Sequence, residues 1–310
     1  MADTNRWFVI VNPTSGNGLA KKRWPVINQL LLENGFDFDY KFTDHAGQSI
    51  EIVQSIINQG FTKIICVGGD GTLHNIVNGI MEQSLLPTTA IKVGVIPIGT
   101  GNDWIKTHGI PKKSRDAITL ISENNECVQD VGRIEFIDEV KKAVYFNNLA
   151  GVGFDGYVVH KVGKYKFIGA LAYLAGALAG LFKFKNFTVE VGAAGQSIKS
   201  KSLMALVGLC QFSGGGMQLT HKSDPADGLF DITIAKDMNK WEVLSNLTKL
   251  FNGQITAYKK VDTFKTNVVS IKTENAKPFI QADGELIGQG SFSATIIPNA
   301  FCFYGTKKPA

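Results

Sequence analysis

Short apolar runs that end in glycine-rich turns dominate the first third of the chain. Residues 7–11, 64–67 and 93–97 are such runs, and each leads into a turn and then a stretch of helical spacing, as in residues 19–32. Short uninterrupted apolar runs are typical of strands buried on both faces of a parallel sheet. The pattern therefore predicts βαβ units whose turns lie together at the carboxyl edge of one sheet, where open α/β sheets bind ligands.

A different pattern begins near residue 130. Strand-like pieces follow one another here, and glycine clusters separate many of them; the pieces are residues 187–191, 203–209, 228–235, 268–272, 279–281 and 291–297. This pattern is typical of a β-sandwich or similar antiparallel domain. The predicted fold class is an α/β N-terminal domain with a parallel sheet and glycine-rich phosphate loops, residues 1–130, followed by a β-rich C-terminal domain, residues 131–310.

Two helical segments interrupt the second domain. Residues 240–251 place apolar side chains on one helical face, which predicts a core helix; they are Trp241, Val243, Leu244, Leu247, Leu250 and Phe251. Residues 167–182 carry no charge and are flanked by lysines, but the segment is too short to span a membrane. A buried helix and a helix that lines a lipid entrance or rests on a membrane are both open for it.

The turn Gly68-Gly69-Asp70-Gly71-Thr72 indicates phosphate chemistry. Its glycines let the backbone approach a polyanion, and N–H groups at the mouth of the next helix can bind phosphate. A carboxylate beside phosphate makes sense if a divalent cation or a reacting hydroxyl is there too. A plain tight turn is the alternative. A second glycine pattern, residues 151–156, fits the dinucleotide fingerprint in form but has no acidic residue about twenty positions later.

Composition narrows the function classes. The 310 residues are 44% hydrophobic and 19% charged, with a net charge of +5, which is ordinary for a globular protein and too weak to indicate a nucleic-acid partner. No stretch qualifies as a transmembrane segment, and the first residues lack the features of a secretory signal. We therefore expect a cytoplasmic protein whose lysines can contact an anionic membrane surface at the inner face.

Six motifs, taken in order, resemble the signature series of the diacylglycerol kinase-like lipid kinases, and the bacterial soluble diacylglycerol kinases and relatives of sphingosine kinase match best. The motifs begin at Asn12, Gly68, Gly99, Gly151, Asp227 and Asp283. The resemblance spans almost the whole chain and implies ATP and Mg²⁺ as cofactors, a lipid substrate at a membrane surface, and a nucleotide domain and a lipid domain that flank a cleft. It also allows the last strand to return to the first domain, and a homodimer is compatible with it.

The resemblance also implies residue roles. Asp283 matches the family's proton acceptor and Asp70 a metal and phosphate residue, although an exchange of these two roles stays open. The implied nucleotide residues are Asn12, Ser15, Gly16, Thr43, Gly69, Asp70, Gly71, Thr72, Thr100, Gly101, Asn102, Asp103 and Glu285. Read from the residues alone, Asp283-Gly284 is a hairpin turn, and Asn102 with Asp103 is a helix cap.

The loop from Ser223 to Leu229 is a candidate metal site. Its two carboxylates and its lack of His or Cys suit Mg²⁺. In the resembled family a structural Mg²⁺ is held by the side chain that matches Asp227 and by carbonyls that match Asp224 and Leu229. An Asp-Gly hairpin without metal is the alternative.

The sequence therefore predicts an ATP- and Mg²⁺-dependent lipid kinase. An NAD kinase-like small-molecule kinase is the alternative enzyme, and a lipid-binding or regulatory protein without turnover is the alternative from another class. Motifs do not encode the shape of the acceptor pocket, so diacylglycerol, a sphingoid base, ceramide and phosphatidylglycerol all stay open as acceptors.

Overall fold

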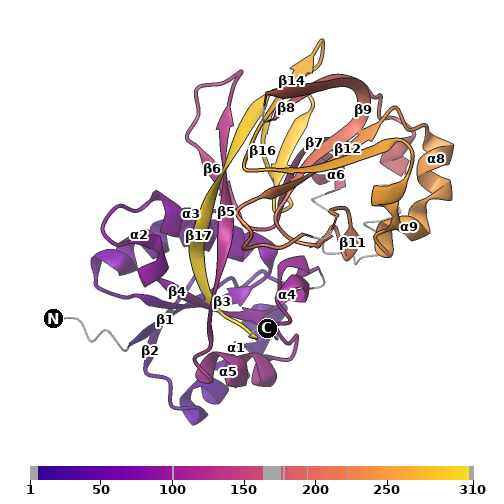
Figure 1. Cartoon of the computed structure of the whole chain (residues 1–310). Helices are drawn as coiled ribbons and strands as arrows, with labels where there is room; N and C mark the ends of the chain where they lie inside the picture. Colours follow the sequence, from indigo (N-terminus) through magenta and orange to yellow (C-terminus); the bar gives the residue numbers. More distant parts are fainter. Residues whose placement is uncertain are drawn as a thin grey trace. The chain divides into compact units, whose positions relative to one another are not determined.

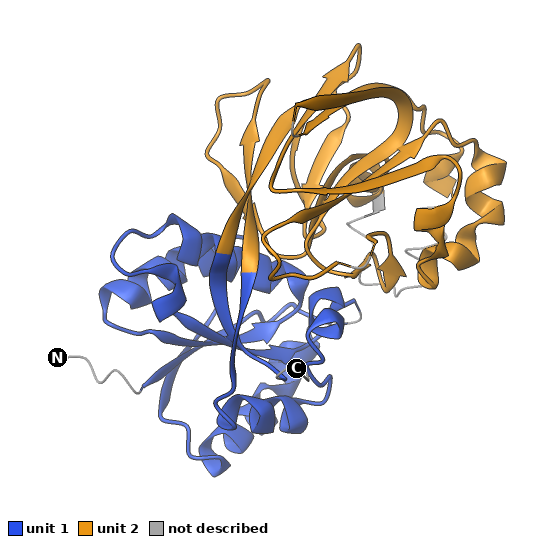
Figure 2. Ribbon diagram, in the orientation of Figure 1, with its two compact units in different colours: residues 1–129, 299–310 blue, residues 130–298 orange. Residues whose placement is uncertain are grey.

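The computed structural model describes residues 6–99, 101–162, 176, 179–193, 195–221 and 223–306. The chain forms two compact units, residues 1–129 with 299–310 and residues 130–298 (Figure 2). Strands β5 (Glu126–Phe136) and β17 (Phe292–Tyr304) each have residues in both units. Thr100 and most of the uncharged segment 167–182 lie outside the described residues.

A parallel sheet forms the centre of the first unit. Its strands are β1 (Trp7–Val11), β2 (Phe38–Phe42), β3 (Lys63–Gly68) and β4 (Lys92–Pro97). They lie in the order β2–β1–β3–β4, and Cys302 and Phe303 of β17 add a further parallel pairing to β4. Every residue of β1 is buried, as expected for a strand covered on both faces.

Helices cover both faces of this sheet (Figure 1). They are α1 (Leu19–Glu33), α2 (Gln48–Asn58), α3 (Asp70–Glu82), α4 (Asp103–Thr107) and α5 (Ser114–Ser122), with the 3₁₀ turn η1 (Thr88–Ala90) before β4. Helix α1 packs beside α5, and α2 packs beside α3. Because side chains alternate along a strand, Val9 and Val11 face the α1 and α5 layer, where they join one core cluster with Ile27 and Ile118.

Antiparallel strands form the second unit. Their path is β16 (Glu285–Gln289), β15 (Phe279–Ala282), β7 (Leu149–Gly153), β9 (Gln196–Gly208), β8 (Phe187–Ala193), β14 (Val268–Glu274) and β17. Off this path lie β12 (Phe230–Lys236), β13 (Val261–Thr266) and β6 (Val144–Phe146), while β10 (Phe212–Ser213) and β11 (Met217–Gln218) form a separate ribbon. The predicted fold class is confirmed by this arrangement.

The helix predicted over residues 240–251 is wrong in two respects. Two short helices, α8 (Lys240–Ser245) and α9 (Leu247–Phe251), meet at Asn246. The Asn246 Nδ2 atom donates to the Glu242 carbonyl at 2.7 Å, and an Asn side chain that bonds to nearby backbone favours a helix end over a helix interior. Moreover, Trp241, expected in the core, is 73% exposed, whereas Val243 is buried.

The remaining helical pieces of the second unit are α6 (Phe154–Val162) and the 3₁₀ turn η3 (Gln254–Ala257). Of the uncharged segment, the described end includes Leu181, which is buried, and Phe182, which is 48% exposed. Within the part of the chain that the structure describes, no helix is both long and apolar enough to cross a bilayer.

Candidate active site

Four chain segments follow neighbouring parallel strands of the first unit and so lie at one edge of its sheet. Thr43 follows β2, residues 12–18 follow β1, Gly69 begins the turn after β3, and residues 98, 99, 101 and 102 follow β4. Thr43 is buried, and its N–H donates to the Val11 carbonyl at 2.9 Å. The predicted nucleotide residues of this unit are therefore brought together, apart from Thr100, which the structure does not describe.

Direct hydrogen bonds tie the first turn to the second. The Asn12 Nδ2 atom donates to Thr72 Oγ1 at 2.9 Å, and Asn12 Oδ1 accepts the N–H and hydroxyl of Thr14 at 3.1 and 2.8 Å. The Ser15 N–H donates to the Asn12 carbonyl at 3.1 Å, so the turn folds back on itself. Asn12 thus connects segments that lie sixty residues apart in the sequence.

Glycines let these turns approach one another closely. A Cβ on Gly68 would lie 2.5 Å from Thr72 Oγ1, and one on Gly69 would lie 3.2 Å from Asn102 Oδ1. Gly16, at a φ of +63°, faces Ile98 and the Gly99 backbone. A side chain at Gly68 would distort its own turn at Thr72, whereas side chains at Gly16 and Gly69 would crowd the turn that follows β4.

Asp70 connects the second turn to the third. It is the first residue of α3, and its carboxylate accepts the N–H of Asp103 at 3.0 Å and the N–H of Trp104 at 3.4 Å. These N–H groups belong to the first turn of α4, where no helical carbonyl is available to accept them. Asp70 therefore caps α4, a function that sequence patterns assigned to Asn102 and Asp103 instead.

Further side-chain contacts hold α4 and its N-cap residue Asn102 in place. Trp104 is 1% exposed, and its Nε1 atom donates to Gln129 Oε1 at 2.8 Å. The Asp103 carboxylate pairs with Lys106 at 2.5 Å. Asn102 has a φ of +48°, and its Nδ2 atom donates to the Gly99 carbonyl at 3.3 Å. These contacts fix the backbone around Gly101 beside Asp70.

Asp283 lies in the second unit, at the hairpin between β15 and β16. Asp283 and Gly284 have φ values of +52° and +79°, as a two-residue hairpin turn requires. The Asp283 carboxylate accepts three consecutive N–H groups, those of Asn147, Asn148 and Leu149, at 3.1, 2.9 and 3.1 Å. The hairpin is thus real, and its carboxylate is oriented by a segment 134 to 136 residues away. Glu285 begins β16 and is exposed.

A side-chain brace supports this hairpin. Gln281 Nε2 donates to Asp155 Oδ2 at 3.0 Å, and Gln281 Oε1 accepts the Gly284 N–H at 2.9 Å. Burial raises the pKa of Asp155 from 3.8 to about 6, against the opposing effect of the Gln281 hydrogen bond. Among the described residues, Asp155 Oδ1 is buried without a hydrogen-bond partner. Gln281 was missed from sequence, although it lies near the end of β15, only two positions before Asp283.

The glycines of residues 151–156 make room for these contacts. A Cβ on Gly151 would lie 2.3 Å from Asp155 Oδ2, and one on Gly156 would lie 2.2 Å from the Phe279 carbonyl oxygen. Close packing of α6 on β15 is therefore enough to explain a pattern that has the form of a dinucleotide fingerprint.

The loop from Ser223 to Leu229 is held by a lysine and by Asp130. Asp227 Oδ2 lies 2.6 Å from Lys265 Nζ, and Asp227 Oδ1 accepts the Leu229 N–H at 3.0 Å. Asp224 Oδ1 accepts the Ala226 N–H at 3.2 Å. Asp130 Oδ2 accepts the Gly228 N–H at 2.7 Å, and the Asp130 N–H donates to the Pro225 carbonyl at 2.7 Å.

Lys265 and the Leu229 N–H each occupy one acceptor position on the Asp227 carboxylate, which leaves further oxygen lone pairs of this carboxylate for other partners. Lys265 lies also 3.6 Å from Asp231 Oδ2, directly across the β12–β13 pair. Burial raises the pKa of Asp231 to about 6, although Lys265 opposes the rise. Within the described ranges no group of three or more His, Cys, Asp or Glu side chains is arranged to hold a metal. The Mg²⁺ expected at Asp224, Asp227 and Leu229 stays a prediction, and the structure shows the Lys265 ion pair in that place.

Comparison with known proteins adds independent information. The diacylglycerol kinase catalytic domain family matches residues 6–134, and a C-terminal NAD kinase beta sandwich-like domain family matches residues 148–304. The chain is 30% identical to a diacylglycerol kinase of Staphylococcus carnosus over 283 residues, which cover 91% of this chain and 89% of that one. It is 29% identical to a diacylglycerol kinase of Bacillus subtilis, and the alignment covers 90% of this chain and 89% of that one.

Solved structures show the same fold. A crystal structure of a diacylglycerol kinase from Bacillus anthracis superposes with a TM-score of 0.73 at 20% identity, over 99% of this chain and 98% of that one. An NAD kinase from Archaeoglobus fulgidus in complex with ATP superposes less well, with a TM-score of 0.54 at 12% identity. That superposition covers 97% of this chain and 94% of the NAD kinase chain. At these identities the structures bear on the fold alone.

We predict that Asp155→Asn makes the stability of the protein less dependent on pH. The folded-state pKa of Asp155 lies above its ordinary value, so its stabilising effect is complete below pH 4 and is lost as the pH rises through about 6. One pKa unit corresponds to about 1.4 kcal/mol, so the variant should gain roughly 1 to 3 kcal/mol over wild type between pH 5 and pH 8. Urea unfolding of both proteins at these pH values measures the difference. Parallel profiles would show that burial does not perturb this carboxyl.

We also predict that Lys265→Met lowers the free energy of unfolding by about 2 kcal/mol, because it leaves the buried Asp231 carboxyl without its cationic neighbour. Urea unfolding measures the loss, and Lys259→Met, an exposed lysine close by in the chain, is the control. If the ion pair alone neutralises this loop, EDTA should leave the melting temperature of the wild-type protein unchanged. A lower melting temperature in EDTA together with one equivalent of Mg²⁺ in the purified protein would instead support the metal site.

Proposed function

The chain belongs to the diacylglycerol kinase family, and from that premise we propose that it transfers the γ-phosphate of ATP, with Mg²⁺, to a hydroxyl of a lipid such as diacylglycerol. One observation carries the proposal. Residues 12–18, Gly68–Thr72 and the described residues 98, 99 and 101–103 converge at one sheet edge and contact each other through glycines and Asn12. That edge offers backbone N–H groups and a carboxylate in a small space, which phosphoryl transfer from a triphosphate needs.

For the nucleotide, we assign the phosphates to the turns of the first unit. The N-cap residue Gly69 and the first turn of α3, which contains Gly71, can direct N–H groups and the positive end of the helix dipole at phosphate oxygens. The residues of the first unit that we propose to line the nucleotide site are Asn12, Ser15, Gly16, Thr43, Thr72, Thr100, Gly101, Asn102 and Asp103. Glu285, in the second unit, is a further proposed nucleotide contact.

Asp70 is the residue we propose to hold the cation. Its hard oxygen atoms suit Mg²⁺, which is commonly bound by one or two carboxylates together with substrate phosphates and waters. When bound, the ion neutralises charge on the phosphates. The N–H groups of Asp103 and Trp104 hold the Asp70 carboxylate in one orientation, so its position depends on α4.

Asp283 is the proposed proton acceptor. The hydroxyl oxygen of the acceptor attacks the γ-phosphorus, the bond between that phosphorus and the bridging oxygen of ADP breaks, and the hydroxyl proton passes to the Asp283 carboxylate. Three N–H donors fix the direction of this carboxylate, and the brace from Asp155 through Gln281 fixes the turn that carries it. Gln281 and Asp155 are therefore positioning residues in this proposal.

An acceptor panel tests the proposal. Purified protein is incubated with γ-labelled ATP, Mg²⁺ and mixed micelles that contain diacylglycerol, a sphingoid base, ceramide or phosphatidylglycerol, with NAD as a competing acceptor. We expect label in a lipid product and none in NADP. Label in NADP alone would favour the NAD kinase-like alternative, and nucleotide and lipid binding without any labelled product would favour a regulatory protein.

Substitution of the two carboxylates should separate their roles. Asp283→Asn should lower kcat by roughly 100-fold or more, the usual cost of losing a general base, with little change in ATP affinity. Asp70→Asn should raise the Mg²⁺ concentration for half-maximal rate by roughly tenfold or more. Steady-state kinetics at varied Mg²⁺ measures both effects, and Asp116→Asn, on the exposed face of α5, is the control.

Thermal melts must accompany these assays, because Asp283→Asn also places an amide group against N–H donors. A folded Asp283 variant with near-normal kcat would remove it from the proton-acceptor role. If the two variants exchanged their phenotypes, Asp70 would be the base and Asp283 the residue that supports cation use.

A further inference from the structure

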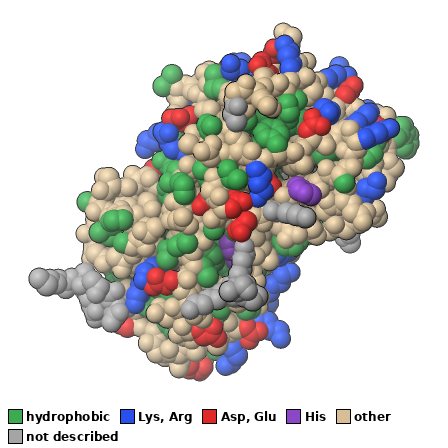
Figure 3. Space-filling view, viewed as in Figure 1, with side chains coloured by type: hydrophobic (Ala, Val, Ile, Leu, Met, Phe, Trp, Pro, Cys, Tyr) green, Lys and Arg blue, Asp and Glu red, His purple; other side chains and the backbone are tan. Residues whose placement is uncertain are grey.

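An exposed aromatic pair lies on the second unit at α8. Trp241 is 73% exposed and Phe182 is 48% exposed, and their ring centroids lie 6.4 Å apart in an edge-to-face arrangement. Lys240 Nζ lies 5.5 Å from the Phe182 ring centroid and donates to the Phe182 carbonyl at 2.6 Å. In the space-filling view, hydrophobic side chains reach the surface over α8, with lysine or arginine side chains near them (Figure 3).

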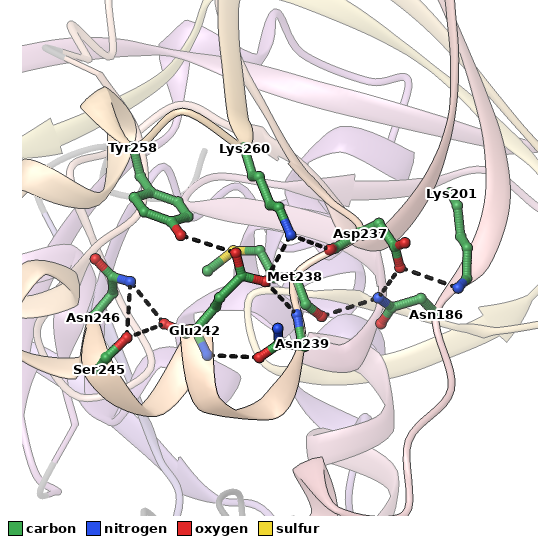
Figure 4. A network of polar contacts seen from close by, with 10 residues as sticks. All are labelled: Asn186, Lys201, Asp237, Met238, Asn239, Glu242, Ser245, Asn246, Tyr258 and Lys260. Atoms are coloured by element: carbon green, nitrogen blue, oxygen red, sulfur yellow. Dashed lines mark hydrogen bonds and ion pairs between the residues drawn. The ribbon is translucent and has the colours of Figure 1, made fainter.

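Helix α8 holds Trp241 in this exposed position by firm contacts on its other sides. Asn239 and Glu242 form a reciprocal capping box, and Val243 belongs to a separate hydrophobic cluster of the second unit, with Leu206 and Met238. The Glu242 carboxylate also binds Lys260 Nζ at 2.7 Å and the Tyr258 hydroxyl at 3.1 Å (Figure 4). The Asn239 N–H and the Lys260 ammonium lower the pKa of Glu242 to about 2, so the network persists across the physiological pH range. Exposure of Trp241 is therefore a property of an ordered helix.

The charge around the pair is strongly positive. Residues 179–186 and 238–260 contain six lysines and one acidic residue, Glu242, which is a net charge of +5 and equals that of the whole chain. Glu242 is paired with Lys260, and the adjacent Asp237 is paired with Lys201 at 3.2 Å and bound by Asn186 (Figure 4). Next to the aromatic pair in the chain, Lys183 and Lys185 are both exposed, and neither forms an ion pair with another described residue.

We propose that this surface, made of Phe182, Lys183, Lys185, Lys240 and Trp241, docks on an anionic lipid bilayer. Tryptophan is enriched at the interface between membrane and water, where its ring lies among headgroups, and each lysine near an anionic surface adds to the attraction. A symmetric contact with a second copy of the chain would bring the same lysines against each other and so is disfavoured. The inference rests on the proposed function in one respect: a lipid kinase that takes its acceptor from a bilayer needs a surface that docks on it.

Intrinsic fluorescence tests this surface directly, because Trp7, Trp24 and Trp104 are buried and Trp241 is exposed. Acrylamide quenching of the wild-type protein therefore reports mainly on Trp241. Vesicles of phosphatidylcholine with phosphatidylglycerol should reduce the quenching and shift the emission to shorter wavelengths, whereas vesicles of phosphatidylcholine alone should not. Trp241→Phe should remove most of the vesicle-dependent change.

Vesicle sedimentation gives the magnitudes. Trp241→Ala should weaken binding to anionic vesicles by roughly tenfold or more, as expected from the loss of a large buried apolar side chain. Lys183→Gln combined with Lys185→Gln should weaken it by roughly thirtyfold at low salt. Matched controls come from the first unit: Leu32→Ala, at an exposed apolar position, and Lys112→Gln combined with Lys113→Gln, at two exposed lysines. Both controls should bind as wild type does.

Three results would overturn the proposal. Trp241 could stay accessible to acrylamide while the protein sediments with vesicles, the controls could lose binding as much as the docking variants, or Trp241 could be shielded in a dimer without lipid, as judged by light scattering. None of these measurements needs ATP or turnover. Vesicle docking without lipid phosphorylation would reject the proposed function alone, whereas phosphorylation of micellar lipid without docking through Trp241 would reject only this surface.

Discussion

Carboxylates that accept backbone N–H groups from distant segments are the interaction on which the candidate site depends. Asp70 holds the start of α4, Asp283 holds residues 147–149, Asp130 holds Gly228, and Asp138 accepts the Ser291 N–H at 2.6 Å. Hydrogen bonds to an ionised acceptor are about twice as strong as those between neutral groups. Irregular loops whose N–H groups have no partner within a helix or sheet can therefore be held in one conformation. The two carboxylates proposed for catalysis also stabilise the structure.

This dual use affects how substitutions are interpreted. Removing either Asp70 or Asp283 would leave N–H groups without their acceptor, which costs stability as well as any chemistry. Glycines reinforce the constraint, since a Cβ on Gly68 would clash with Thr72 and a Cβ on Gly69 would crowd Asn102. The same few positions thus combine backbone geometry, loop anchoring and proposed catalysis, so activity is interpretable only together with a measurement of folding.

The parts that could be predicted from sequence are those set by local pattern. Apolar runs followed by glycine turns identify β1, β3 and β4, and adjacent parallel strands are enough to place their turns at one edge. Partners far apart in the chain were not predictable: Asp70 with Trp104, Asp283 with Asn148, and Lys265 with Asp227 depend on strand register and loop path. The single helix predicted over 240–251 failed because periodicity does not reveal that Asn246 ends α8 with its own side chain.

Strand β17 has a consequence for how the chain is made. Its residues Cys302 and Phe303 pair with Lys92 and Val93 of β4, more than two hundred positions earlier. While the ribosome is still synthesising the second unit, the β4 edge of the first sheet lacks this neighbour, and an apolar strand with an open edge can pair with other chains. The first unit therefore emerges early from the ribosome but completes its sheet late. Nascent chains that stop short of β17 should need chaperone protection even though all three glycine-rich turns and most of the core have already been synthesised.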